Sequence, residues 1–250
     1  MYRRFVLIFL TCLLAFQAHA AGLVLNSYAY RDLNNVLLLH FNGADASTTF
    51  TDSATAKTIT ANGNAQIDTG QSVFGGASGL YDGAGDYLSA ASSSDFDFGS
   101  GDFTIDLRVR PNGLSAHHGL VSLSNSALTQ GGFFLEFDSG GSPSTPLRMY
   151  TMYTDGTVDD IHASVAFSTG TWYHIAVVRN GTNFAMYVDG TQRATWTSSK
   201  TLRDAPNGLV SGRIYTDSNA HYFDGWMDEL RVSKGIARWT SGFTPPSAEY

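Results

Sequence analysis

The chain has 250 residues, of which 43% are hydrophobic and 15% are charged, and its formal net charge at pH 7 is −7. An acidic chain lacks the basic surface that binds phosphate backbones, so this charge argues against a nucleic-acid partner. Glutamate and lysine occur only three times each, whereas glycine, serine, threonine and aspartate are abundant. That balance favours strands and turns over helices.

The first twenty residues have the pattern of an export signal. Arg3 and Arg4 precede an apolar stretch from Phe5 to Phe16, and Ala18-His19-Ala20 has the small-residue spacing of a cleavage site. The apolar stretch is shorter than a membrane-spanning helix requires, and no later apolar run reaches about 18 residues. We therefore expect cleavage after Ala20, no membrane span in the mature chain, and a secreted, periplasmic or cell-surface location.

The mature chain is expected to fold without cysteine chemistry. The single cysteine, Cys12, lies inside the signal, so neither a disulfide nor a cysteine metal site remains after cleavage. Residues 21–35 are expected to form an N-terminal leader. Residues 36–250 are long enough for one large all-β domain with a sizeable core.

From residue 36 onward, short apolar or alternating stretches are separated by turn residues about every eight to twelve positions, which is typical of a β-sandwich. The stretch 102–110 alternates most clearly, with its four apolar residues on one side, and Pro111 ends it. The expected strands lie within 36–41, 59–67, 79–89 (two strands around a glycine turn), 102–110, 120–123, 132–137, 147–153, 161–167, 172–190, 209–215 and 226–232.

Two turns in the last third of the chain predict three consecutive strands. Asn180-Gly181 separates two apolar stretches, and this dipeptide is the strongest short-range signal for a hairpin. Asp189-Gly190 follows at once and predicts a second tight turn. The three strands are therefore expected to form a meander.

Several of these segments resemble, in the same order, those of laminin-G-like (concanavalin A-like lectin/glucanase) jelly-roll domains. One departure is Arg108, where members of that family often carry an aromatic residue. The matching segments are Leu37–Gly43, Tyr81–Leu88, Asp102–Ile105, Trp172–Ile175, Tyr187–Gly190, Phe223–Arg231 and the tail Lys234–Pro246.

The resemblance implies an all-β jelly-roll β-sandwich of two antiparallel sheets, in agreement with the strand pattern. It also implies a non-catalytic binding module, with a carbohydrate or another cell-surface ligand as its partner. Two other functions remain open. One is a structural or adhesive spacer in an envelope or phage-like assembly, and the other is a glycoside hydrolase that uses an aspartate pair.

The resemblance further implies a structural calcium ion, bound by a late-strand aspartate and by backbone carbonyls near the first strand and an early glycine turn. Asp228 is informative because it alternates in phase with the apolar residues of 226–232, where a buried carboxylate needs a partner. The alternatives are a hydrogen-bonded turn or a pairing with Arg231 or Arg213. The corresponding metal-binding positions are Asn42, Gly43, Asp45, Asp82, Gly85 and Asp228.

Sugar recognition requires aromatic faces beside fixed polar groups, and six residues on the expected central strands and rim meet that description. The alternative for each aromatic residue is packing in the core or covering of the surface. The candidate ligand-binding residues are Arg108, Tyr150, Tyr153, His162, Tyr187 and Trp196.

Glycoside hydrolysis requires two carboxylates, and the related glucanases place two glutamates close together on one strand. Glu136-Phe-Asp138 is the nearest pattern in this chain and lacks the second glutamate. We therefore expect the protein not to be an enzyme.

Removal of the signal gives the first testable prediction. N-terminal sequencing of the exported protein should begin at Ala21, because signal peptidase cleaves after the small-residue motif that ends at Ala20. Recovery of an intact chain from Met1 in the cytosolic fraction would contradict export.

Overall fold

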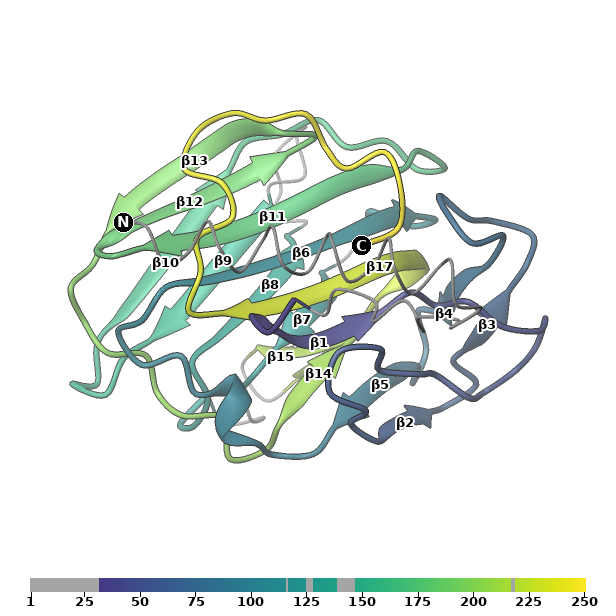
Figure 1. Cartoon of the computed structure of the whole chain (residues 1–250), viewed down its shortest axis with the longest axis horizontal. Coiled ribbons are helices and arrows are strands. Elements are labelled where there is room, and N and C mark those ends of the chain that lie inside the picture. The colour runs from purple at the N-terminus through teal and green to yellow at the C-terminus, as the bar shows by residue number, and fades with distance from the viewer. Residues whose placement is uncertain (1–31, 116, 125–127, 139–146, 217–218) are drawn as a thin grey trace, which may run out of the picture. The chain divides into compact units, whose positions relative to one another are not determined.

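Strands dominate the described part of the chain and form two large antiparallel sheets (Figure 1). The computed structural model describes residues 32–115, 117–124, 128–138, 147–216 and 219–250, so the expected signal and most of the leader lie outside the described residues. Residues 33–250 form one compact unit, to which the following description refers. Within the described residues, no helix has the length and apolar character needed to cross a membrane.

The first sheet is built around β17 (Asp224–Lys234), which pairs with β6, β4 and β1. In spatial order, this sheet contains β13 (Thr191–Thr197), β12 (Asn183–Val188), β11 (Tyr173–Asn180), β6 (Phe103–Pro111), β17, β4 (Ser78–Asp82) and β3 (Gln66–Asp68), with β1 (Asn35–Leu39) also paired to β17.

The second sheet packs against the first, and a small hairpin adjoins it. Its spatial order is β10 (Val158–Ala163), β9 (Leu147–Met152), β8 (Phe133–Phe137), β7 (His118–Ser122), β14 (Leu209–Ser211), β5 (Tyr87–Ala90) and β2 (Ile59–Asn62). The hairpin consists of β15 (Arg213–Thr216) and β16 (Asn219–Tyr222), and a short 3-10 helix covers Ser94–Phe96.

The core lies between the two sheets and is rich in phenylalanine. Phe103 on β6 and Phe133 on β8 lie nearly parallel, with ring centroids 6.1 Å apart, and Phe98 stacks on Phe103 at 4.6 Å. All three side chains are almost completely buried. The alternation predicted for 102–110 is confirmed, because the apolar residues of β6 face this core.

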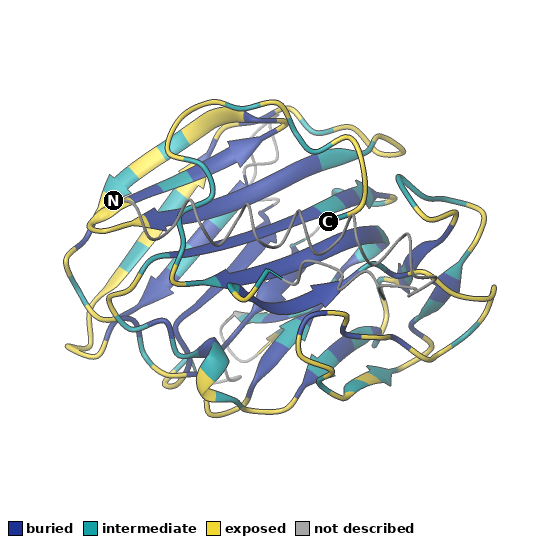
Figure 2. Cartoon of the chain, in the orientation of Figure 1, coloured by how far each residue is buried: buried dark blue, intermediate teal, exposed yellow. Residues whose placement is uncertain are grey.

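The C-terminal tail, residues 235–250, covers the outer face of the first sheet. Figure 1 shows it in yellow, passing across β12 and β11 toward β6 and β17. Thr104 of β6 donates a hydrogen bond to the carbonyl of Ile236, and Arg108 donates one to the carbonyl of Pro246. Figure 2 accordingly shows β11, β6 and β17 as buried strands, whereas β13 is mostly exposed.

A buried charge network joins this tail to the sheet. Arg231 of β17 donates two hydrogen bonds to Asp106 of β6, at 3.0 and 3.1 Å. The hydroxyl of Tyr250 also donates to Asp106, and His174 Nε2 lies 3.3 Å from the same carboxylate. Burial alone would raise the pKa of Asp106, but the hydrogen bond with His174 and the charge of Arg231 outweigh it, so this pKa lies below the ordinary aspartate value.

Three details of the strand order differ from the sequence expectation. The expected pair within 79–89 is split between sheets, because β4 pairs with β17 while β5 pairs with β14. The stretch 59–67 divides in the same way into β2 and β3. The expected strand 209–215 is interrupted at Gly212, which has a φ of 87° and lies against the ring of Tyr81.

The expected alternation along β17 is also wrong beyond residue 228. A β-bulge lies between Asp228 and Arg231, and Glu229 within it has a φ of 51°. Because a bulge adds one residue to the strand, Leu230 faces the core, whereas Asp228 shares the outer face with its register partner Arg108. Asp228 is nevertheless completely buried.

The network around Asp106 predicts a large cost for removal of its charge. Asp106→Asn leaves Arg231 without its partner in a buried position, which should lower the free energy of unfolding by about 3–5 kcal/mol at pH 7. Urea titration measures this change. Asp155→Asn in an exposed turn is the control and should change little.

The same network predicts the direction of a pH effect. Because the folded-state pKa of Asp106 is lowered, its stabilisation is complete above the unfolded pKa of about 3.9 and is lost as the pH falls through the folded value. The Asn variant should lack this acid-dependent component. An Asn variant within about 1 kcal/mol of the wild type at pH 7 would contradict this account.

Candidate ligand-binding site

Three neighbouring strands of the second sheet present a polar and aromatic outer face. The register places Phe134, Tyr150 and Asp160 in one row across β8, β9 and β10. The next row contains Glu136, Arg148 and His162. These residues alternate with core residues such as Leu135 and Met149, so they point away from the core. We call these six residues the polar–aromatic face.

The aromatic row provides a flat surface. The rings of Phe134 and Tyr150 are stacked at 5.0 Å with an angle of 7° between them. The guanidinium of Arg148 lies 5.3 Å from each ring centroid. Phe134 is fully buried and Tyr150 is half-buried, so Tyr150 is the ring available for contact with a ligand.

Arg148 is held by two carboxylates. It donates to Glu136 at 2.9 Å and makes two hydrogen bonds to Asp160, at 2.8 and 3.0 Å. Burial raises the pKa of Glu136 above its ordinary value, although the hydrogen bond from Arg148 opposes that rise. Burial alone would also raise the pKa of Asp160, but the hydrogen bonds and charge of Arg148 outweigh it and keep that pKa low.

Two histidines contact the carboxylates of this face, His117 from the side of the small hairpin and His162 from β10. His117 Nδ1 lies 3.2 Å from both Glu136 and Asp138, and its ring is 4.8 Å from that of His221 on β16. His162 lies 3.4 Å from Asp138 and 3.1 Å from Asp160. With 42% of its side chain exposed, His162 can also reach a ligand from outside.

This arrangement suits binding better than hydrolysis. An aromatic ring beside fixed donors and acceptors can contact the apolar side of a sugar and bind its hydroxyl groups. Glu136, the only glutamate on the face, is fully buried and already bonded to Arg148. A general acid must reach the glycosidic oxygen, and a carboxyl held in this way is poorly placed to do so.

The structure does not bring the six sequence-predicted ligand residues together at one place, although Tyr187 and Trp196 line the same trough on the first sheet. Tyr150 and His162 share the polar–aromatic face. Tyr153 lies in the core, where its hydroxyl donates to Asp159 at 2.6 Å. Trp196 is half-buried on β13 and stacks on the core residue Phe184 at 4.8 Å.

The remaining two ligand candidates lie on the first sheet. Arg108 is on its outer face, where it bonds to Pro246 of the tail and lies over Phe74. Tyr187 is also on that outer face and is almost completely buried against Phe243 of the tail. Both are therefore separated from Tyr150 by the thickness of the sandwich.

Asp228 is a buried carboxylate with one oxygen hydrogen-bonded to a neighbouring loop. Its Oδ2 accepts hydrogen bonds from the backbone N–H groups of Val73 and Phe74, at 2.8 and 3.1 Å. Its Oδ1 is buried and has no hydrogen-bond partner among the described residues. Burial raises the pKa of Asp228 to about 6, although the backbone N–H groups of Phe74, Val73 and Glu229 oppose the rise. Neither Arg231 nor Arg213 forms an ion pair with it among the described contacts.

The other sequence-predicted metal positions divide into two groups. Asn42 lies against Gly75, on the same loop that bonds to Asp228, and Gly43 directly follows it. Asp45 accepts a hydrogen bond from the N–H of Thr69 at the start of that loop. Asp82 pairs with Asp224, at the far end of β4 from Asp228, and Gly85 lies in the turn beyond it.

A metal at Asp228 would need carbonyl oxygens as further ligands. In the described part of the chain, no group of three or more histidine, cysteine, aspartate or glutamate residues is arranged to hold an ion. Calcium accepts backbone and amide carbonyls alongside a carboxylate, so Oδ1 of Asp228 and the side-chain carbonyl of Asn42, which lies against Gly75 of the same loop, fit that ion in chemical type.

The sequence-based selection of ligand residues left out Arg148, Asp160 and His117, although the acidic stretch 155–160 and the pair His117-His118 are candidates by residue type. The roles of Arg148 and Asp160 depend on cross-strand neighbours, and that of His117, which precedes β7, depends on Glu136 and Asp138. The available signal was the period of two along 158–163 and 147–152, which places Asp160 with His162 and Arg148 with Tyr150 on one face. Only the register between strands shows that the two pairs adjoin.

The fold defined by these two sheets is a concanavalin A-like jelly roll. A family model described as the concanavalin A-like lectin/glucanases superfamily matches residues 82–238. Because that match covers more than half of the chain, the protein belongs to this superfamily. No curated protein sequence matches the chain.

Solved structures of similar fold include two toxin domains and one domain of an enzyme. The binding domain of Paraclostridial Mosquitocidal Protein 1 has a TM-score of 0.60 and 16% identity, over 81% of this chain and 49% of that one. The botulinum neurotoxin serotype G binding domain has a TM-score of 0.60 and 14% identity, over 81% of this chain and 48% of that one. The chain thus spans about half the length of these toxin domains.

Domain 4 of AbnA, a GH43 extracellular arabinanase from Geobacillus stearothermophilus, was solved in complex with arabinotriose. It has a TM-score of 0.59 and 18% identity, over 82% of this chain and 94% of that domain. At these identities the likeness establishes the fold alone.

Proposed function

We propose that this protein is an exported, non-catalytic module that binds carbohydrate through the polar–aromatic face. The observation that carries the proposal is the half-buried ring of Tyr150, which is stacked on Phe134 and flanked by Arg148. A ring fixed in this way loses little conformational freedom when a sugar packs on it. Asp160 and His162 lie beside the ring and can bond to sugar hydroxyl groups.

Two further considerations support binding rather than another role. The similar domain of the arabinanase was solved with arabinotriose, and two similar toxin domains are described as binding domains. A spacer would not need the buried carboxylate of Glu136, paired with Arg148, on an outer face, since buried charges are costly to retain. The burial of Glu136 also supports the absence of hydrolytic activity.

We also propose that Asp228 helps to bind a structural calcium ion, together with carbonyl oxygens near Asn42. The support is the buried Oδ1 without a partner and the pKa raised to about 6, since an unpaired buried carboxylate costs free energy. The ion would neutralise that carboxylate and tie the loop containing Val73 to β17.

The binding proposal predicts the effect of two substitutions at one position. Tyr150→Ala should weaken binding of the best oligosaccharide from a glycan array by at least tenfold, about 1.4 kcal/mol, because the stacking surface is removed. Isothermal titration calorimetry measures the change, with arabinotriose as the first probe. Tyr150→Phe keeps the ring and should bind within about threefold of the wild type.

Two results would count against this function. Absence of binding to every glycan on the array would favour the spacer role. Release of reducing sugar from a polysaccharide, abolished by Glu136→Gln, would show that the protein is a hydrolase.

The calcium proposal predicts a chelator effect on thermal stability. An ion bound only by the folded state stabilises it by about 2.7 kcal/mol at a hundredfold excess over the dissociation constant. The melting temperature should therefore fall when chelator is added, and Asp228→Asn should melt lower and respond to neither chelator nor calcium. Asp82→Asn is the matched control and should keep the response, because Asp82 lies at the other end of β4. A wild-type melting curve unmoved by both additions would exclude the ion.

A further inference from the structure

We propose a second ligand site, for a neutral oligosaccharide, on the outer face of the first sheet. It is a trough between strands β11, β12 and β13 and the C-terminal tail at Trp239, with a volume of about 470 Å³. That volume lies within the range of small-molecule sites in proteins, about 300–1,000 Å³. The trough is independent of the polar–aromatic face, which belongs to the other sheet.

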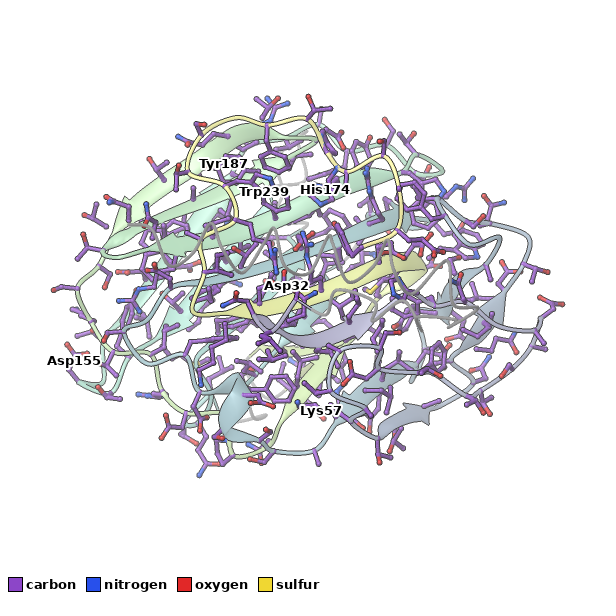
Figure 3. All side chains as sticks on the ribbon, in the orientation of Figure 1. Asp32, Lys57, Asp155, His174, Tyr187 and Trp239 are labelled. Atoms are coloured by element: carbon purple, nitrogen blue, oxygen red, sulfur yellow. The ribbon has the colours of Figure 1, made fainter. Side chains whose placement is uncertain are left out.

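The floor of the trough is apolar and aromatic. Val178, Ala185 and Tyr187 form it, and they belong to a small cluster outside the main core that also includes Trp239 and Phe243. Figure 3 shows Tyr187 close to Trp239, which belongs to the C-terminal tail. Tyr187 is almost completely buried, whereas Trp239 is half-buried and lines the trough.

The wall that carries Trp239 is fixed in place. Its indole stacks on Phe243 at 4.0 Å with an angle of 6°, and His174 lies edge-on to it at 5.6 Å. The N–H of Phe243 donates to the carbonyl of Gly190, in the turn between β12 and β13. A Cβ on Gly190 would lie 1.7 Å from the carbonyl oxygen of Phe243, so this close approach requires glycine. The aromatic wall is therefore ordered before any ligand arrives.

The rim of the trough is polar and uncharged. Asn183, Gln192 and Thr195 line it, together with further amide and hydroxyl side chains, and none of its lining residues is charged. This is notable in a chain of net charge −7. Amides and hydroxyls offer both donors and acceptors, and the half-buried indole of Trp239 suits the apolar side of a pyranose or furanose ring.

The uncharged, polar and aromatic lining favours one class of ligand over the others. A phosphate or sulfate group would need a cationic partner, and a metal ion would need carboxylates, but the lining residues provide neither. A lipid tail would leave the polar rim without hydrogen bonds when buried. A short neutral oligosaccharide offers apolar ring faces to the aromatic side chains and hydroxyl groups to the polar rim.

A blocking substitution tests the trough without disturbing the fold. Thr195 is exposed on the edge strand β13, so Thr195→Arg should fill the trough while the sheet stays intact. Thr191→Arg adds the same side chain at an exposed position of the same strand that does not line the trough, and it is the matched control. Both substitutions are made in the mature chain carrying Tyr150→Ala, so that binding at the polar–aromatic face does not contribute.

Calorimetry with a panel of neutral oligosaccharides, including arabinotriose, is the measurement. We expect at least one member to bind the Tyr150→Ala protein and its Thr191→Arg derivative equally, and the Thr195→Arg derivative at least tenfold more weakly. Trp239→Ala should cause a similar loss. Equal binding by the two arginine derivatives would overturn the proposal, and so would absence of binding by the Tyr150→Ala parent.

Other occupants of the trough give distinguishable results. If the trough receives a second copy of the chain, sedimentation analysis will show a dimer that Thr195→Arg abolishes, and no sugar will bind there. That outcome also overturns the proposal. It leaves the proposed function of the polar–aromatic face untouched, since Tyr150 lies on the other sheet.

Discussion

The pairing of Asp106 with Arg231 inside the first sheet determines which surfaces of this protein are free. The pair lies on the outer face of the two central strands, where an exposed sheet would normally meet water. Its charges are buried because the C-terminal tail covers them and Tyr250 completes the bonding of Asp106. The hydrogen bond of Tyr250 to Asp106 and the packing of its ring on Arg231 hold the tail over β6 and β17. The trough at β11–β13 lies beside this covered region, whereas the polar–aromatic face belongs to the second sheet.

The polar–aromatic face also depends on carboxylate–arginine pairs, which here fix the side chains of a candidate binding surface. Glu136 and Asp160 hold Arg148 between them, and Arg148 in turn lies over the stacked rings of Phe134 and Tyr150. Each side chain is fixed by its neighbours, so the face is ordered before it meets a ligand. A preorganised surface keeps more of its contact energy as affinity, because less is spent on ordering side chains. The need to fix Tyr150 therefore explains why charged residues stand on this face, where a purely structural sheet would carry small polar residues.

The fold was largely predictable because its signals are local. The period of two along 102–110, the Asn180-Gly181 turn and the order of the family segments each refer to neighbours in sequence. The bulge at Glu229 and the crossing between β4 and β5 were not predictable, because both depend on strand register. The site was predictable only in part for the same reason. Tyr150 and His162 could be chosen by residue type, whereas Arg148 and Asp160 gain their roles from strands that lie beside them only after folding.

Mapping of a bound glycan by NMR tests the central claim most directly. Isotopically labelled mature protein would be titrated with the oligosaccharide that binds best on the array, and backbone amide and arginine side-chain shifts would be followed. The account predicts the largest changes on β8, β9 and β10, with the Nε–H of Arg148 among them. Binding that leaves these three strands unperturbed would contradict the claim that the polar–aromatic face is the ligand site.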